Sequence, residues 1–128
     1  MADVADSASM SVLTINAGSS SIRFAFYGPG AAATKLEYGK IERIGESGAA
    51  FEASTGPGNT PERIALDAAN FGAAVESLLR WLESQPRFAE VTAVGHRVVH
   101  GMTHTQPARV TPQLLEELKA AIPYDPEH

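Results

Sequence analysis

The sequence predicts an α/β fold in which a mixed β-sheet carries packed helices. Short segments rich in β-branched and aromatic residues open the chain, and from residue 67 apolar residues recur at helical spacing. A further strand-like segment and a second helix-like segment follow. Strands succeeded by an alternation of helix, strand and helix are typical of a mixed sheet with helices on it. The 128 residues fit one domain, and 44% apolar residues are enough for a modest core.

A β-hairpin opens the predicted sheet. Residues 11–15 are rich in Val, Leu, Thr and Ile, and they end at the turn-forming run Asn-Ala-Gly-Ser-Ser-Ser over residues 16–21. The segment after this run alternates with the period of a strand that has one apolar face, and its apolar members are Ile22, Phe24 and Phe26. We therefore expect two strands joined by a tight polar turn, with residues 28–30 closing the far end.

Two more strands and a loop follow in the chain. Residues 35–44 predict a third strand, in which Gly39 indicates a bulge. Residues 50–54 are compatible with a short fourth strand. Residues 55–61 are dense in Gly, Pro, Asn and Thr, which predicts a loop.

A helix is expected to begin near residue 67 and to end before Pro86. Its apolar residues form one stripe over four turns, made of Phe71, Val75, Leu78, Leu79 and Leu82. Residues 91–99 are apolar on both faces over their first half, which predicts a strand covered on both sides.

A last helix is predicted from Thr111, which serves as its N-cap, with Pro112 in the first helical position. Its apolar side carries Leu114, Leu115, Leu118 and Ile122, and Pro123 is expected to end it. We find no internal repeat and no linker long enough to separate a second domain.

Composition and charge exclude several classes of function. A net charge of -5 argues against nucleic acid or an anionic membrane surface as the partner. The chain has no Cys, so it has neither a thiol nucleophile nor a thiolate metal site. No apolar run approaches the ~18 residues needed to cross a bilayer, and the start lacks the pattern of a secretory signal. We therefore expect a cytoplasmic protein whose residues 1–10 are a disordered leader.

The turn at residues 16–21 is the segment richest in possible chemistry. Gly18 lets backbone N–H groups approach an anion closely, and the hydroxyls of Ser19, Ser20 and Ser21 add donors. Asn16 offers a neutral oxygen suited to a hydrated Mg²⁺. These residues suggest a phosphate cradle, although a plain polar hairpin loop has the same composition. They do not form a P-loop, because the P-loop Lys is missing and a strand follows instead of a helix.

Two arginines are further candidates for anion contacts. Arg97 lies near the end of a strand, above small residues that leave room for its guanidinium to bind a carboxylate or phosphate bidentately. A salt bridge to a nearby Glu is the alternative. Arg23, two residues past the turn, either reaches back over the phosphate or is an ordinary solvated charge. His96 and His100 would lie about 13 Å apart in a strand, too far to share a metal; only on a helix would their spacing suit zinc.

The run over residues 12–24, Val-Leu-Thr-Ile-Asn-Ala-Gly-Ser-Ser-Ser-Ile-Arg-Phe, resembles the opening of the acetate kinase family. Residues 95–101, Gly-His-Arg-Val-Val-His-Gly, are similar to a second motif of that family. Both are long and occur in the family's order, and the resemblance covers residues 11–128. It implies the N-terminal, ribonuclease-H-like half of the two-domain fold shared by sugar kinases, actin and the Hsp70 ATPase domain, in an incomplete form.

The resemblance also implies roles for individual residues. Asn16 matches the position assigned to Mg²⁺, and Arg23 matches a lysine that contacts ATP. Gly18, Ser19, Ser20 and Ser21 correspond to the turn at the nucleotide's phosphates. Arg97 matches the catalytic arginine that holds the acetate carboxylate or the transferring phosphoryl group. Met102 stands where the family has a second glycine, which implies either that it crowds the substrate side or that it places a flexible apolar contact near the acetate methyl.

These features lead us to expect a kinase that transfers a phosphoryl group reversibly between ATP and acetate with Mg²⁺. The family's C-terminal nucleotide-binding domain, with its adenine pocket, lies outside residues 11–128, so we expect this chain alone to be inactive. The full-length protein is expected to be a homodimer. The alternatives are a non-catalytic module that binds phosphate or a partner protein, and a kinase for propionate or butyrate.

Overall fold

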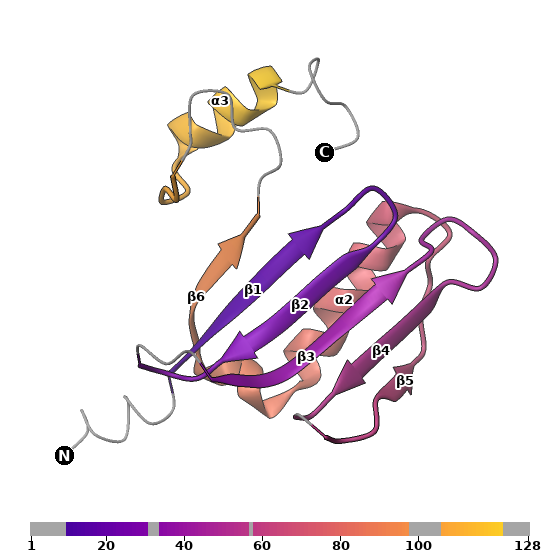
Figure 1. Cartoon of the computed structure of the whole chain (residues 1–128). Helices are drawn as coiled ribbons and strands as arrows, with labels where there is room; N and C mark the ends of the chain where they lie inside the picture. The colour runs from indigo at the N-terminus through magenta and orange to yellow at the C-terminus, as the bar shows by residue number, and fades with distance from the viewer. Residues whose placement is uncertain (1–9, 31–33, 57, 98–105, 122–128) are drawn as a thin grey trace. The chain divides into compact units, whose positions relative to one another are not determined.

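The computed structural model describes residues 10–30, 34–56, 58–97 and 106–121. The chain forms two compact units, Met1–His96 and Arg97–His128. The described strands all lie in the first unit, where they form one sheet in the order β5-β4-β3-β2-β1-β6 (Figure 1). Their bounds are Ser11–Ala17 for β1, Ile22–Tyr27 for β2, Lys35–Glu42 for β3, Ala50–Ser54 for β4, Glu62–Ile64 for β5 and Val91–His96 for β6.

The sheet is mixed, as the sequence predicts. Strands β1 to β5 pair with their neighbours in antiparallel fashion, whereas β6 runs parallel to β1. The predicted hairpin is confirmed, because Ala17 pairs with Ile22 on either side of the turn. The predicted strand at residues 50–54 is confirmed as well. Strand β5 was not expected, because three residues next to a loop rich in Gly and Pro show no usable alternation.

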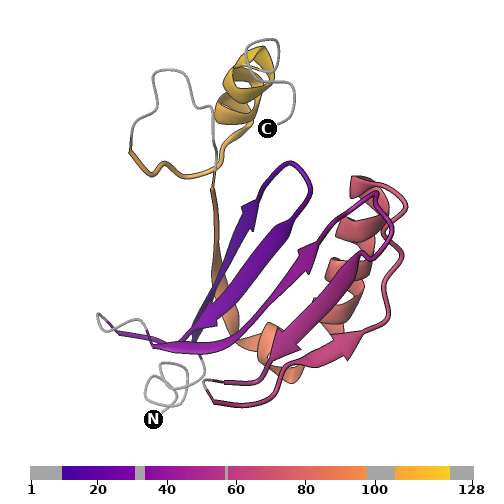
Figure 2. The same cartoon turned by 45° about the vertical axis from the view of Figure 1, so that its right-hand side comes forward.

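One helix of the first unit, α2 (Phe71–Ser84), covers one face of the sheet (Figures 1 and 2). It begins later than expected, since the side chain of Asn70 caps it by accepting a 2.8 Å hydrogen bond from the N–H of Ala73. Its buried residues are Ala74, Ser77, Leu78 and Leu82. Leu79, expected in the same stripe, is 44% exposed because it lies one residue beyond the line of contact. The short 3-10 helix η1 (Pro86–Glu90) leads on to β6.

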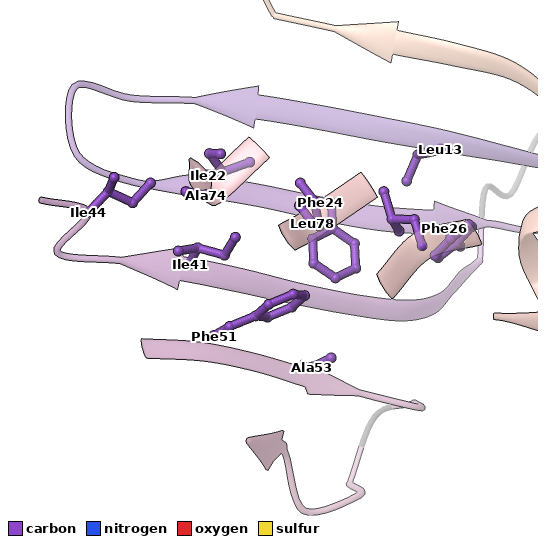
Figure 3. Packing of buried hydrophobic residues seen from close by; sticks show 11 residues of the cluster. Leu13, Ile22, Phe24, Phe26, Ile41, Ile44, Phe51, Ala53, Ala74 and Leu78 are labelled. Atoms are coloured by element: carbon purple, nitrogen blue, oxygen red, sulfur yellow. The ribbon is translucent and has the colours of Figure 1, made fainter. Parts of the chain in front are cut away.

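Aliphatic and aromatic side chains form the core between α2 and the sheet (Figure 3). Phe24 packs edge to face against Phe26 and Phe51, with ring centroids 6.4 and 6.1 Å apart. Trp81 of α2 lies 5.5 Å from Phe24 and 5.4 Å from Phe51. These edge-to-face contacts add to the stabilisation that burial of the rings provides.

Gly39 is not the bulge that the sequence suggested. It pairs directly with Phe24 on one side and with Ala53 on the other. A Cβ atom at this position would come within 2.6 Å of the Phe24 ring and of the Glu52 carbonyl oxygen. Glycine is therefore needed because the aromatic core approaches the backbone closely. The irregularity in the pairing lies nearer the start of β3, where Phe26 pairs with Glu37 and Tyr27 with Lys35.

Strand β6 differs from the expectation of a strand covered on both sides. Its residues after Val91 are exposed, and Val94 is 57% exposed. The reason is that β6 is an edge strand, paired with β1 alone among the strands described. The continuation predicted for residues 98–99 lies outside the described residues.

The second unit contains α3 (Pro112–Ala121). Its predicted start is confirmed, because the hydroxyl of Thr111 accepts a hydrogen bond of 3.1 Å from the N–H of Leu114. The residues expected to end this helix, Ile122 and Pro123, lie outside the described part of the chain. Among the helices described, none has the length and apolar character to span a membrane.

Candidate functional site

The turn between β1 and β2 lies at one end of the sheet, together with the turn between β3 and β4 and the start of α2 (Figure 1). The N–H of Gly18 donates a 2.8 Å hydrogen bond to the carbonyl of Ser21, which closes the turn over Ser19 and Ser20. Ser19 is exposed, and Ser20 and Ser21 are half-buried. The predicted phosphate turn is thus a tight, defined structure whose polar groups border solvent.

Close packing inside the turn explains its glycine. A Cβ atom on Gly18 would lie 3.0 Å from the hydroxyl oxygen of Ser21. Any larger residue would therefore push this hydroxyl away from its position. The glycine is therefore needed here because the chain packs closely within the turn.

The strand register places the polar candidates in one row. Asn16 pairs with Arg23 across β1 and β2, and Arg23 pairs with Lys40 across β2 and β3. Paired residues of adjacent strands project on the same face, so these three side chains share the face of the sheet opposite the core. The sequence singled out Asn16 and Arg23, and the register adds Lys40.

A carboxylate holds the two cations of this row. The Oε1 atom of Glu42 lies 3.2 Å from Nη2 of Arg23 and 3.3 Å from Nζ of Lys40. All three side chains are substantially exposed, at 59% for Arg23, 40% for Lys40 and 41% for Glu42. The group therefore keeps one net positive charge next to the turn, and it remains within reach of an anion from solvent.

A shallow hollow of about 280 Å³ lies on the same face of the sheet. Arg23 and Lys40 line it together with Tyr38, Glu52 and Ser54. Its walls carry both signs of charge, so the hollow itself is not selective for anions. The positive charge of the hollow comes from Arg23 and Lys40, which lie on the side next to the turn.

Arg97 follows β6 directly and is exposed. It begins the second compact unit, whereas Asn16, the serines and Arg23 belong to the first. In the first unit His96, the last residue of β6, pairs with Ile15, so β6 ends two residues before the level at which β1 ends at Ala17. His96 itself therefore lies in a strand, as the sequence predicts. His100 and Met102 lie outside the described residues.

The donor atoms near the turn fit one particular kind of Mg²⁺ site. In the part of the chain that the structure describes, no three His, Asp or Glu side chains gather into a metal-binding group. Near the turn the possible side-chain oxygen ligands are the amide of Asn16, the serine hydroxyls and the carboxylate of Glu42, which is already paired with Arg23 and Lys40. Mg²⁺ commonly keeps several waters and binds through a substrate's phosphates with few protein ligands. The residues fit a metal ion that arrives with a nucleotide, and they do not form a cage of their own.

Sequence reasoning missed Lys40, Glu42 and the turn that follows them. Their approach to Arg23 depends on the register between β2 and β3, which the irregularity near Lys35 sets. The opposite charges of Lys40 and Glu42, two positions apart, were the available signal, and they do not reveal which strand lies alongside.

Comparison with known proteins connects these features to a family. The model of the Acetokinase family matches residues 11–128. Over 120 residues the chain is 38% identical to the acetate kinase of Deinococcus radiodurans, and the match covers 93% of this chain and 29% of that protein. The acetate kinase of Methylocella silvestris is 36% identical over 129 residues, which cover 91% of this chain and 32% of the relative.

Solved structures agree with the sequence matches. A propionate kinase from Francisella tularensis superposes with a TM-score of 0.76 at 27% identity, over 93% of this chain and 30% of that one. The acetate kinase of Porphyromonas gingivalis gives a TM-score of 0.75, also at 27% identity, over 93% and 31%. The fold predicted from the sequence, that of the actin and Hsp70 superfamily, is therefore confirmed. The chain spans about three tenths of the length of these relatives.

Proposed function

The chain belongs to the acetokinase family, and from this premise we propose that it forms one wall of the active-site cleft of an acetate kinase. The proposed reaction joins a carboxylate oxygen of acetate to the terminal phosphorus of ATP. It breaks the bond between that phosphorus and the ADP oxygen, so the products are acetyl phosphate and ADP. The reaction is reversible. The relatives are kinase-type phosphotransferases, which supports this class of chemistry.

The observation that carries the proposal is the turn Gly18–Ser21 with Arg23 beside it. Phosphoryl transfer depends mainly on positioning and on stabilising the charge of the phosphate oxygens. Backbone N–H groups and serine hydroxyls at a tight turn supply fixed donors for these oxygens. The guanidinium of Arg23 adds a positive charge that is exposed enough to meet them.

We assign Asn16 a supporting role next to a nucleotide-bound Mg²⁺. The amide oxygen of Asn16 would orient one of the waters around the ion or bind the ion directly, in line with its place opposite Arg23. When bound, Mg²⁺ neutralises charge on the phosphates. Arg97 is proposed to bind the carboxylate of acetate or the transferring phosphoryl group through its planar fork.

A cleft needs two walls, and the chain covers about three tenths of its relatives' length. We therefore propose that residues 11–128 act as part of a longer enzyme, expected to be a cytoplasmic homodimer. We expect the 128-residue chain by itself to show little or no acetate-dependent ATP turnover. Turnover close to that of the Deinococcus radiodurans enzyme, assayed in parallel, would contradict this proposal. Complete failure to bind MgATP or tripolyphosphate would instead favour a non-catalytic module that binds a partner.

The role of Arg97 is tested in a protein of the relatives' length. Arg97→Ala should raise the KM for acetate or lower kcat by at least about 100-fold, because a charge-assisted bidentate contact is lost. Arg80→Ala is the matched control, since Arg80 lies exposed on α2. If the two substitutions have equal effects, Arg97 does not bind the substrate and the proposed role is wrong.

A second candidate activity is phosphoryl transfer to propionate, favoured by the similarity to a propionate kinase structure. The two activities share the phosphate turn and differ in the pocket for the acyl chain. We propose that Met102 contributes to this pocket. Relative kcat/KM values for acetate, propionate and butyrate separate the candidates, and Met102→Gly should shift the preference if the residue lines the pocket.

A further inference from the structure

Four consecutive residues, Glu42–Gly45, connect the phosphate turn to the rest of the first unit. Glu42 forms the ion pair with Arg23 described above. The N–H of Ile44 donates a 2.9 Å hydrogen bond to the carbonyl of Ser20, inside the phosphate turn. The N–H of Gly45 donates an equally short bond to the carbonyl of Ala68, just before α2. We name residues 42–45 the brace.

The brace exists because Arg43 adopts an unusual backbone conformation. Its φ angle is +59°, and it is the one non-glycine residue with positive φ in the described part of the chain. This left-handed conformation is unfavourable for side chains with a Cβ atom. It reverses the chain at the end of β3, helped by a 3.0 Å hydrogen bond from the N–H of Glu46 to the carbonyl of Arg43. The reversal turns the N–H of Ile44 towards Ser20.

Two anchors keep the brace in place. The side chain of Ile44 is only 8% exposed and belongs to the buried core cluster (Figure 3). The hydrogen bond from Gly45 fixes the other side of the reversal to the segment before α2. Because both anchors are attached to the core, the N–H of Ile44 is a fixed donor for Ser20.

Fixing the Ser20 carbonyl also fixes the next donor of the turn. A trans peptide unit is planar, with its C=O and N–H pointing in opposite directions. The carbonyl of Ser20 and the N–H of Ser21 belong to the same unit. A 2.9 Å bond that draws the carbonyl towards Ile44 therefore directs the N–H of Ser21 away from the brace.

We propose that Arg43 is a positioning residue of the phosphate turn, acting through its left-handed backbone and the bond from Ile44 to Ser20. The guanidinium of Arg43 lies over Gly48, where a Cβ atom would be 3.2 Å from its Nη1. The Arg43 side chain therefore lies against the turn between β3 and β4. The bond from Ile44 to Ser20 is made by main-chain atoms, so the proposed effect on the ligand passes through the main chain. The inference rests on the proposed function, because it assumes that the turn binds phosphate.

The test compares substitutions that differ in their tolerance of positive φ. Arg43→Gly removes the side chain and accepts the left-handed conformation freely, whereas Arg43→Val disfavours it strongly. Arg43→Thr, which is also β-branched but polar, is a second variant in case the valine variant does not fold. We use the 128-residue chain and magnesium tripolyphosphate as the probe, with affinity measured by calorimetry. Amide hydrogen exchange at Ile44 reports the bond to Ser20 independently of the ligand.

We expect Arg43→Gly to retain the affinity of the unmodified chain within twofold, Arg43→Thr to lose about threefold and Arg43→Val about tenfold. Exchange at Ile44 should quicken in the same order. Affinity within twofold for the valine variant would overturn the inference while leaving the proposed function intact. A glycine variant as weak as the valine variant would overturn it too, because the side chain would then be responsible. Absence of tripolyphosphate binding by the unmodified chain would refute the phosphate turn and the inference with it.

Discussion

Replacing Gly39 with alanine should destabilise the first unit by forcing the aromatic core apart. The new methyl group would lie 2.6 Å from Cζ of Phe24 and 2.6 Å from the carbonyl oxygen of Glu52. Favourable contacts between carbon atoms lie at roughly 3.5–4.0 Å, so the ring has to retreat by about 1 Å. The backbone oxygen on the other side is held by the pairing of β3 with β4 and yields even less.

The surroundings of Phe24 decide the size of the effect. Its ring is 3% exposed and has three aromatic neighbours, Phe26, Phe51 and Trp81, at 5.5 to 6.4 Å between centroids. Overpacking a core of this kind costs about 1–3 kcal/mol. Replacing a strand glycine with alanine otherwise gains about 0.5–1 kcal/mol in backbone entropy. We expect a net loss of about 1.5 kcal/mol in the free energy of unfolding, somewhat more than a tenfold change in the folding equilibrium.

Urea unfolding followed by the fluorescence of Trp81 measures this loss, because Trp81 is the single tryptophan and contacts Phe24. Gly28→Ala is the matched control: its added methyl group meets Leu36 at 3.6 Å, an ordinary contact, and should change stability by less than about 0.5 kcal/mol. Phe24→Leu shortens the side chain that clashes. The double variant should therefore lose at least about 1 kcal/mol less than the sum of the single losses. Additive losses, or an alanine variant as stable as the control, would refute the steric argument.

Substitutions at three further positions test individual contacts of the first unit. Asn70→Ala should destabilise by about 1 kcal/mol through loss of the α2 cap, as seen by urea unfolding, and Asn70→Asp should recover most of it; equal losses would exclude the cap. Arg87→Met leaves the carboxylate of Glu37, which is 15% exposed, without its partner at 3.0 Å. The thermal midpoint should fall by roughly 4–8 °C for a loss of about 1 kcal/mol, whereas an unchanged midpoint would show that the pair contributes nothing. Gly18→Ala should displace the Ser21 hydroxyl and weaken tripolyphosphate binding about threefold with little change in stability; unchanged affinity would exclude this hydroxyl from the site.

Local sequence patterns were sufficient for the elements whose signals lie within a few residues. The turn after β1 follows from a run of Asn, Gly and Ser, and the start of α3 follows from Thr111 and Pro112. The polar turn as a candidate anion site rests on the same kind of local information. The predictions of the turn and of the helix start are confirmed because backbone preferences and capping bonds act over short distances along the chain.

Local sequence patterns could not predict the pairing of strands or the close contact between a residue and a neighbouring strand. Gly39 looks the same in a sequence whether it forms a bulge or faces a ring, and only the position of Phe24 on the neighbouring strand distinguishes the two. Val94 has the composition of a covered residue, yet it is exposed because β6 lies at the edge of the described sheet. Both outcomes depend on residues far away in the chain.

The sequence by itself determined the fold class, the polar turn at Gly18–Ser21 and the choice of Asn16 and Arg23 as candidates. The tertiary structure decided which groups join them: Lys40 and Glu42 across the sheet, and the N–H of Ile44 on the carbonyl of Ser20. The physical reason is that strand pairing sets contacts between residues about twenty positions apart. A shift of one residue in that pairing would place the same charges on the opposite face.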